Sequence, residues 1–299
     1  MTDLRERVPG HSLIDELIRQ WELGNISVDD QTNAVIAEDA HGWYRGVLGE
    51  RRVAEILDEL EECVVLHSVP VGSGTTDIDH VVVSQAGVFT INSKYSPGRD
   101  VWFAGRGMFV GGFKQAYILN SLREAGRAAD ALSKATGMTV PVTGVIVFIE
   151  PGKLTQKATP GGDDGDPEIK VVRDVRLLSA LRGSPIFSPE QAGRILDAAV
   201  RPETWHRSPV ESTTGASIAR EFLALEEALG PRLAQEYAAP VAATRSRGSA
   251  AQSAKYAAAR ASKARVKKQA KREKMLVELL GAITLIVGAL IGLALFAGR

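Results

Sequence analysis

The chain has almost no cysteine: Cys63 is the one cysteine among 299 residues. A single cysteine excludes a disulfide bond within the chain and a zinc site of the CxxC type. Cys63 lies in the apolar run Cys-Val-Val-Leu, where we expect a buried small hydrophobic side chain. Thiol catalysis has little support, because no paired histidine motif accompanies this cysteine. No serine–histidine–aspartate arrangement stands out either.

Other common signals are also missing. Residues 1–10 are polar and charged, so no secretory signal opens the chain. Gly72-x-Gly74 is not a phosphate loop, because neither Gly-Lys-Ser/Thr nor the full dinucleotide-binding fingerprint follows it. His67 and His80 have no metal-ligand partner at a suitable spacing, so we expect a structural or exposed role for each. We find no internal repeat.

Charge is balanced overall, with 36 Lys and Arg residues against 36 Asp and Glu residues. Residues 241–274 nevertheless hold eleven Lys or Arg and one acid, Glu273, a balance of +10, which leaves −10 for the remainder. This stretch has hardly any large apolar residue and cannot bury a core, so we interpret it as a basic linker. Its role is open between attraction to anionic lipid, which we favour, contact with nucleic-acid phosphates, and solubilisation.

An apolar segment follows the basic linker. Residues 275–296 are apolar except for Glu278, Thr284 and glycines, and this length is close to the roughly 20 residues that cross a bilayer. The preceding run Lys-Lys-Gln-Ala-Lys-Arg-Glu-Lys is basic, and positive flanks stay in the cytoplasm. We therefore expect a single-pass C-terminal transmembrane helix over residues 275–297, with the main domain cytoplasmic. A buried C-terminal core helix is the alternative.

Apolar spacing predicts helices and strands in alternation before residue 241. Helices are expected at residues 11–23, 31–60, 114–132, 188–200 and 216–229. The first of these is amphipathic and either caps the domain, which we favour, or binds a partner. Strands are expected at residues 63–69, in two runs within 75–94, in a hairpin over 101–113, at 142–149, and at the edge over 168–172, with a loop over 151–167. This order predicts an α/β fold with a mixed sheet flanked by helices.

Chemistry is concentrated in residues 75–94. Val81 to Val83 form a β-branched run, and a second apolar run follows the break at Gly87. On the second strand Asn92 and Lys94 are two residues apart, so both side chains point to one face. If the strands pair, the carboxylate of Asp79 joins this face. A carboxylate, an amide and an ammonium group would then form one polar patch.

These residues resemble a known family. Asp79, twelve residues and then Asn92-x-Lys94 is similar to the D…(D/E)xK signature of the PD-(D/E)XK nuclease fold. Gly49-Glu50 upstream, Asp-Ile-Asp-His-Val-Val-Val before Gly-Val-Phe-Thr-Ile-Asn-Ser-Lys, and Gln115 downstream form an ordered set that resembles the NERD (nuclease-related) domain. The similarity covers roughly residues 43–135. One departure is that Asn92 stands where the family pattern has an acid.

The resemblance implies a restriction-endonuclease-like fold and a metal-dependent nuclease site. It implies Asp79, Glu50 and Asn92 as ligands of Mg²⁺ or Mn²⁺, Lys94 at the attacking water or the phosphate, and Gln115 as a positioning residue. Glu50 is equally open to being an exposed helix acid, and Gln115 and Arg123 to being solvent-exposed. The neutral amide of Asn92 weakens metal binding, so the alternative is a degenerate nuclease-like domain that binds nucleic acid or a protein partner without cutting it.

The expected organisation has five parts. They are an N-terminal helical segment (1–40), a nuclease-like domain (41–200), a helical extension (201–240), the basic linker (241–274) and the transmembrane helix (275–297). Nucleic acid, the membrane and anionic lipid are the expected partners. A third reading is a non-catalytic membrane adaptor whose linker recognises anionic lipid.

Overall fold

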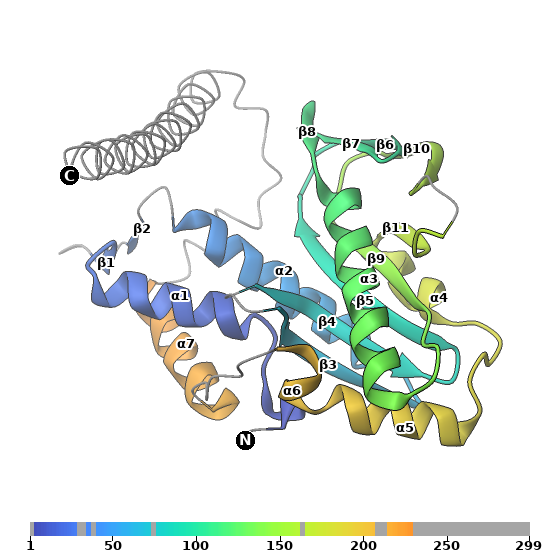
Figure 1. Cartoon of the computed structure of the whole chain (residues 1–299). Helices are drawn as coiled ribbons and strands as arrows, with labels where there is room; N and C mark the ends of the chain where they lie inside the picture. Colours follow the sequence, from blue (N-terminus) through green and yellow to red (C-terminus); the bar gives the residue numbers. More distant parts are fainter. Residues whose placement is uncertain are drawn as a thin grey trace, which may run out of the picture. The chain divides into compact units, whose positions relative to one another are not determined.

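The computed structural model describes residues 3–28, 34–36, 40–72, 76–161, 165–206 and 214–229 (Figure 1). The helices of this part are η1 (Leu4–Glu6), α1 (His11–Glu22), α2 (His41–Leu57), α3 (Tyr117–Thr136), η2 (Asp174–Arg176), α4 (Leu177–Leu181), α5 (Pro189–Ala199), α6 (Pro202–Trp205) and α7 (Gly215–Leu229). The strands are β1 (Ile26–Val28), β2 (Ala34–Ile36), β3 (Cys63–Pro70), β4 (Asp77–Ser84), β5 (Gly87–Tyr95), β6 (Val101–Gly105), β7 (Gly107–Val110), β8 (Phe113–Gln115), β9 (Val142–Ile149), β10 (Leu154–Pro160) and β11 (Ile169–Arg173).

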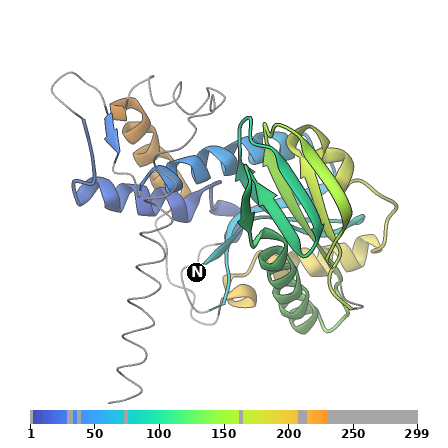
Figure 2. The same cartoon turned by 90° about the horizontal axis from the view of Figure 1, so that it is seen from above.

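A five-stranded mixed sheet with the order β11-β9-β5-β4-β3 forms the main core. β4 is antiparallel to its neighbours β3 and β5, whereas β9 is parallel to β5 and β11 is parallel to β9. Helices α2 and α3 lie on opposite sides of this sheet (Figures 1 and 2). The mixed α/β class expected from the sequence is therefore confirmed.

Burial of both sheet faces explains the apolar run in β4. Val81 and Val83 pack in one cluster with Ala125 of α3. Val82, between them, packs on the other face with Leu57 of α2. Because successive side chains of a strand point to opposite faces, a strand covered by helices on both sides is apolar at consecutive positions.

A second, four-stranded sheet has the order β10-β6-β7-β8. The expected hairpin is confirmed: β6 and β7 pair from Val101↔Val110 to Ala104↔Gly107, and Gly105 takes a φ of 52° at the turn, which favours glycine. One face of this sheet packs on Ile118 of α3. The small sheet therefore sits against the same helix as the main sheet.

The structure corrects the expectation of a loop over residues 151–167. Leu154–Pro160 is the strand β10, which pairs in parallel with β6. The segment Leu-Thr-Gln-Lys-Ala-Thr-Pro is mostly exposed, so its side chains carry little strand pattern. Its extended conformation comes from backbone pairing with β6. Because β6 is distant in the sequence, the residues of 151–167 alone do not predict this strand.

Two predicted helix boundaries were also wrong. The helix expected over residues 31–60 begins at His41, and Ala34–Ile36 is a strand paired with Ile26–Val28. The helix expected over residues 114–132 runs from Tyr117 to Thr136, and residues 113–115 belong to β8. In both places a short strand pairs with a neighbouring hairpin arm and delays the helix start.

The other three predicted helices, over residues 11–23, 188–200 and 216–229, agree with the structure. α1 and α7 match the predicted helices and pack in one apolar cluster with α2. The predicted cap of α5 is confirmed: Ser188 is the N-cap, Pro189 follows it, and Gln191 completes a capping box. β11 pairs with β9 alone and is the predicted edge strand.

The chain divides into two compact units, residues 1–242 and 243–299. The predicted basic linker (241–274) and transmembrane helix (275–297) lie outside the described residues, as does the end of the helical extension. Within the part that the structure describes, no helix combines the length and apolar character needed to cross a membrane. The predicted span therefore stays a prediction.

Two histidines contact each other within the main sheet. His67 of β3 and His80 of β4 are paired in register, and their Nδ1 atoms are 2.9 Å apart, so one ring donates to the other. Burial lowers the pKa of His67 to about 4, and burial followed by the neighbouring ring lowers the pKa of His80 well below its usual value. Both rings are therefore neutral near pH 7, in keeping with a structural role.

This pair should make stability depend on pH. A histidine with a lowered pKa in the folded state resists protonation that the unfolded chain accepts, so stability falls as pH drops below about 6.5. We expect His67→Asn, which keeps a hydrogen-bonding group but does not titrate, to lose less stability than the wild type between pH 7 and pH 4, by up to about 3 kcal/mol. Chemical denaturation at several pH values measures this difference. Parallel pH curves for the two proteins would contradict it.

Candidate functional site

The site is built where β4 and β5 separate. Their pairing runs from Ser84↔Gly87 to His80↔Ile91 and then stops. β4 continues beside β3 as far as Asp77, and β5 continues beside β9 as far as Tyr95. The sheet therefore opens between its two central strands, and backbone groups along the opening need other partners.

Asp79 occupies this opening. Its Oδ2 accepts hydrogen bonds from the backbone N–H of Ser93 at 2.7 Å and from the Ser93 hydroxyl at 2.8 Å. The carboxylate thus replaces the strand partner that Ser93 lacks. Two bonds to one oxygen fix the carboxylate, and its Oδ1 makes no hydrogen bond among the described residues.

Asn92 and Lys94 lie together on the α3 side of β5, as their spacing predicts. The Lys94 ammonium contacts Asn92 Oδ1 and donates to the backbone oxygen of Ser93 at 2.9 Å. The same ammonium lies 5.0 Å from the centre of the Tyr117 ring, a cation–π distance. The lysine is therefore held over the patch by an amide, a carbonyl and an aromatic face.

Glu124 of α3 completes the patch. Asn92 Nδ2 donates to both oxygens of the Glu124 carboxylate, at 3.1 and 3.3 Å. Burial, followed by the charge of Asp79, raises the pKa of Glu124 to about 7, although the Asn92 bond, Lys94 and Arg127 oppose this shift. The charge of Asp79 thus contributes to the raised pKa of Glu124, as it does to that of Glu50.

The sequence reasoning missed Glu124 and considered Arg123 instead, which is exposed. A usable signal was present. Glu124 follows Ser121 by three positions and precedes Ala128 by four, and both of those residues are buried. Helical periodicity therefore places Glu124 on the face of α3 that packs against the sheet. A carboxylate on such a face is uncommon and indicates a specific partner.

Glu50 is buried, with 4% of its surface exposed, so it is not an exposed helix acid. It comes from α2, on the other side of the sheet. Its Oε2 accepts from the backbone N–H of Gly10 at 2.9 Å and from the Ser68 hydroxyl at 3.2 Å. Burial, and then the charges of Asp79 and Asp77, raise its pKa well above the usual value.

Ser68, which binds Glu50, has a strained backbone. Its φ is 45°, a value that costs non-glycine residues on the order of 1–3 kcal/mol. Besides donating to Glu50, its hydroxyl accepts from His11 N at 3.0 Å, and its backbone oxygen accepts from Arg7 Nε at 2.8 Å. Glu50 thus helps to hold the start of α1 against this irregular point of β3.

Asp77 stands two residues before Asp79 on β4. Burial raises the pKa of Asp77, and a hydrogen bond from Ser12 and the charge of Arg7 oppose that shift. The side chain of Asp77 therefore interacts with residues of the N-terminal segment. Asp77 adds negative charge near Asp79 without entering the contacts around Asn92.

Gln115 lies apart from these groups. It is the last residue of β8, paired with Met108, and not the first residue of a helix. Among the described residues its side-chain amide donates to Phe113 O at 3.5 Å. Of the predicted site residues, Asn92 and Lys94 contact each other, and Asp79 is bonded to Ser93 between them. Glu124, which was not predicted, is bonded to Asn92. Glu50 lies on α2, and Gln115 lies in the β7–β8 hairpin.

Comparison with known families adds a finding to this geometry. Residues 45–149 match the family model described as the nuclease-related domain, NERD. This part of the chain, about a third of its length, is similar to the NERD domain. The match runs from α2 to the end of β9 and includes Glu50, Asp79, Asn92, Lys94 and Glu124. No curated protein matched the chain, and no solved structure did.

The nuclease-like group to which the NERD domain is related is typically metal-dependent, so the fit to a metal ion can be tested. In the described ranges, no three His, Cys, Asp or Glu side chains lie close enough to hold an ion by themselves. Asp79 and Glu124 nevertheless offer two carboxylates, and Asn92 offers an amide oxygen. Mg²⁺ is commonly bound by one or two carboxylates plus water and substrate phosphate. The donors of the NERD domain fit such an open site.

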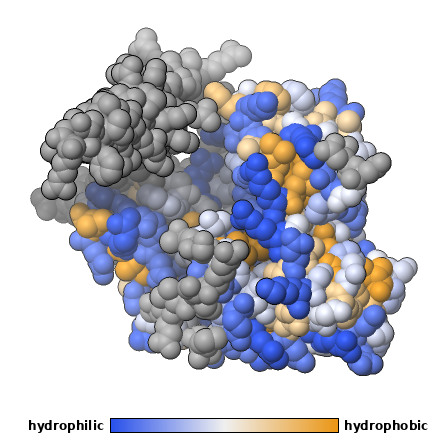
Figure 3. All heavy atoms as spheres, in the orientation of Figure 1, coloured by the Kyte–Doolittle hydropathy of each residue, from blue (hydrophilic) through white to orange (hydrophobic). Residues whose placement is uncertain are grey.

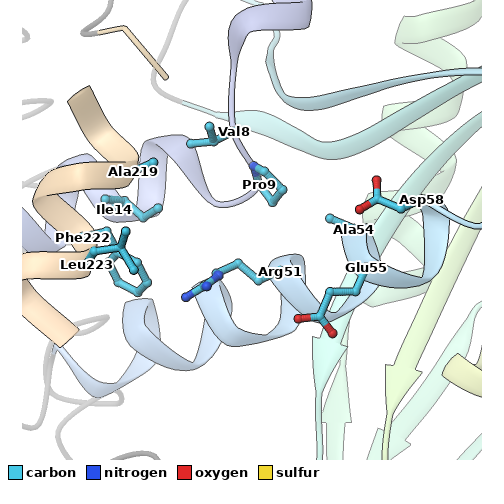
Figure 4. Close-up of a pocket in the computed structure, with 10 residues that line it drawn as sticks. All are labelled: Val8, Pro9, Ile14, Arg51, Ala54, Glu55, Asp58, Ala219, Phe222 and Leu223. Carbon is cyan, nitrogen blue, oxygen red and sulfur yellow. The ribbon is translucent and has the colours of Figure 1, made fainter. Parts of the chain in front are cut away.

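A pocket of the protein lies elsewhere. It has a volume of about 320 Å³ and lies between α1, α2, α7 and the segment before α1. Figure 4 shows the residues that line it. It is lined by Val8, Pro9, Ile14, Arg51, Ala54, Glu55, Asp58, Ala219, Phe222 and Leu223. Arg51 there is paired with Glu226 at 2.9 Å and lies over the Phe222 ring. None of the lining residues belongs to the patch around Asp79.

The contacts of Glu50 lead to a stability prediction. Glu50→Ala removes the acceptor of Gly10 N and of the Ser68 hydroxyl, and leaving such groups unpaired costs about 1–3 kcal/mol. Glu50→Gln keeps an acceptor oxygen and should stay within about 1 kcal/mol of the wild type. Chemical denaturation measures both values.

The matched control is Glu55→Gln, an exposed position on the same helix, which should change stability little. Titration with Mn²⁺ separates the two roles open to Glu50. A structural carboxyl predicts unchanged Mn²⁺ affinity in Glu50→Gln. Strongly weakened Mn²⁺ binding with normal stability would instead make Glu50 a metal ligand.

Proposed function

We propose that the NERD domain hydrolyses phosphodiester bonds of nucleic acid with Mg²⁺ or Mn²⁺ bound by Asp79, Glu124 and Asn92. One observation carries this proposal: the Asn92 amide, at the position of the family acid, holds the Glu124 carboxylate. A second carboxylate thereby reaches the region of Asp79 from α3. The nuclease-related family match supports the reaction class.

When bound, the metal ion would neutralise phosphate charge and lower the pKa of a bound water. Neighbouring residues of the chain orient the proposed metal ligands. Ser93 fixes Oδ2 of Asp79 and leaves Oδ1 for a ligand. Asn92 orients Glu124, whose pKa is raised first by burial and then by the charge of Asp79. A cation between two carboxylates relieves the repulsion between them.

Lys94 supplies the positive charge of the proposed site. Its ammonium can turn from Asn92 Oδ1 to a phosphate oxygen or to the attacking water, because both are anionic or polar acceptors. The Tyr117 ring and the Ser93 carbonyl keep it near the patch. In this proposal Glu50 is a structural carboxyl and Gln115 belongs to the small sheet.

A second candidate is a nuclease-like domain that binds nucleic acid without cutting it. The observation that favours it is the contact between the Lys94 ammonium and Asn92 Oδ1. In that contact the Lys94 ammonium is not turned toward a substrate, and Asn92 Oδ1 is not available to a metal ion. The two candidates share the surface and differ in whether metal ions produce cleavage.

The prediction that separates them concerns Lys94 and Glu124. Full-length protein offered plasmid, linear and single-stranded DNA and RNA should cleave at least one substrate with Mg²⁺ or Mn²⁺. Lys94→Ala and Glu124→Gln should each lower the rate by about 100-fold, the usual effect of removing one charge-stabilising group. Glu124→Gln should also weaken Mn²⁺ binding, measured by calorimetry.

Lys134→Ala is the control, because this lysine lies in the last turn of α3 and is exposed. It should cleave like the wild type. Folded protein that cuts no substrate with either metal would reject the nuclease proposal and favour the binding candidate. Cleavage that survives Lys94→Ala would show that the activity comes from another site.

We also propose that residues 275–297 anchor the protein in a membrane, with the NERD domain in the cytoplasm and the basic linker against anionic lipid. The support is the apolar sequence and its basic flank. The full chain should stay with membranes after alkaline carbonate extraction, and a chain ending at residue 274 should be released. Equal release of both proteins would contradict the anchor.

A further inference from the structure

The small sheet exposes aromatic side chains that its own packing does not need. In the described part, the exposed large apolar residues are Leu23, Trp102, Phe113, Val175, Ile186 and Leu223. The two aromatic residues among them, Trp102 (41% exposed) and Phe113 (57% exposed), both belong to the sheet β10-β6-β7-β8. Phe113 pairs with Val110 and shares its inner face, so Trp102 is the one that lies on the outer face. Figure 3 shows apolar surface among hydrophilic surface at the upper end of the molecule, over strands β6 to β8.

The outer face of this sheet has an ordered row of side chains. Strand register places Thr155 of β10, Trp102 of β6, Phe109 of β7 and Lys114 of β8 next to one another. The rings of Trp102 and Phe109 are stacked, with centroids 4.3 Å apart and planes 8° apart. The inner face, which includes Phe103, is the one that packs on α3.

Positive charge accompanies the rings. Lys114 lies in the row itself, Lys153 immediately precedes β10, and Lys157 belongs to β10, two residues after Thr155. All three lysines are exposed. Asp100 is the acid near this group, and its Oδ1 is already bound by the backbone N–H of Lys153 at 2.8 Å. Stacked aromatic rings bordered by lysines match the chemistry of nucleic-acid bases and phosphates.

The small sheet follows directly in the chain after β5, the strand that carries Asn92 and Lys94. Tyr95 ends β5, and the turn that follows leads directly into β6. At this junction Arg45 lies over the Tyr95 ring, 6.0 Å from its centre. Burial, and then the charge of Arg99, lower the pKa of Arg45, so two guanidinium groups are close together there. Arg99 thus places positive charge in the turn that joins the strand of Lys94 to the small sheet.

We propose that the outer face of β10-β6-β7-β8 is a stacking platform that binds single-stranded nucleic acid and leads it to the patch around Asp79. This proposal extends the proposed function. It rests on that function for the statement that the bound nucleic acid is then cleaved. Aromatic rings reach the faces of bases in a single strand, whereas bases of a duplex are stacked on each other. The occupant is therefore a single strand of DNA or RNA, and its phosphates lie on Lys114, Lys153 and Lys157.

The test measures binding without cleavage. Full-length protein in detergent and EDTA is titrated with a fluorescent oligo-dT of about 12 nucleotides, a length typical of such sites. Trp102→Thr/Phe109→Thr, which keeps strand-favouring residues, should weaken Kd about tenfold or more. Leu223→Thr, an exposed apolar position on α7, is the control and should leave Kd unchanged.

A second variant keeps the test decisive if the aromatic one folds poorly. Lys114→Gln/Lys157→Gln should reduce the slope of log Kd against log salt by about 1.4, since each phosphate contact to a single strand contributes about 0.7. Lys134→Gln is its control. Photo-cross-linking with 5-bromodeoxyuridine in the oligonucleotide should map to peptides that contain Trp102 or Phe109.

Each outcome has a definite meaning. Unchanged Kd in the aromatic variant, cross-links elsewhere alone, or equal loss of duplex binding would overturn the platform. Binding in EDTA does not depend on catalysis. A platform that binds oligo-dT in a protein that never cleaves would therefore reject the nuclease proposal alone, whereas cleavage lost in Lys94→Ala with unchanged binding in the aromatic variant would reject the platform alone.

Discussion

The separation of β4 from β5 beyond His80 and Ile91 is the constraint on which the site depends. A sheet that opens leaves backbone groups without partners, and buried ones must be satisfied. Asp79 meets this need by accepting from Ser93 N. The carboxylate is therefore required by the fold as well as by the proposed chemistry, and its position is fixed by the strand that also carries Asn92 and Lys94.

Negative charge collects around the opening from several elements. Burial raises the pKa of Glu50, Asp77 and Glu124, and in each case the charge of Asp79 adds to the shift. Glu50 and Asp77 are bonded to the N-terminal segment, which lies outside residues 45–149. The segment before α2 thus stabilises two of these groups. Glu124 is the member of this group that lies on the α3 side of the sheet, where it is bonded to Asn92.

Local sequence predicted the elements whose patterns are local. The Val81–Val83 run, the hairpin at Gly105 and the cap at Ser188 each depend on neighbours within a few residues, and the structure agrees with them. β10 and β2 form by pairing with distant or weakly patterned segments. The residues within a short stretch of sequence therefore do not predict them. The candidate site divides in the same way: strand alternation brought Asn92 and Lys94 together, but Glu124 required the packing of α3 on the sheet.

Asn92 replaces the acid of the family pattern, but it binds the carboxylate of Glu124. The proposed site can therefore still have a second carboxylate. An acid at position 92 would face Glu124 with a second negative charge and could not donate a hydrogen bond to it. The amide donates to Glu124 through Nδ2 and accepts from Lys94 through Oδ1. One residue thereby orients a carboxylate from α3 and an ammonium from its own strand. In the proposed site the second carboxylate therefore comes from α3 instead of from β5.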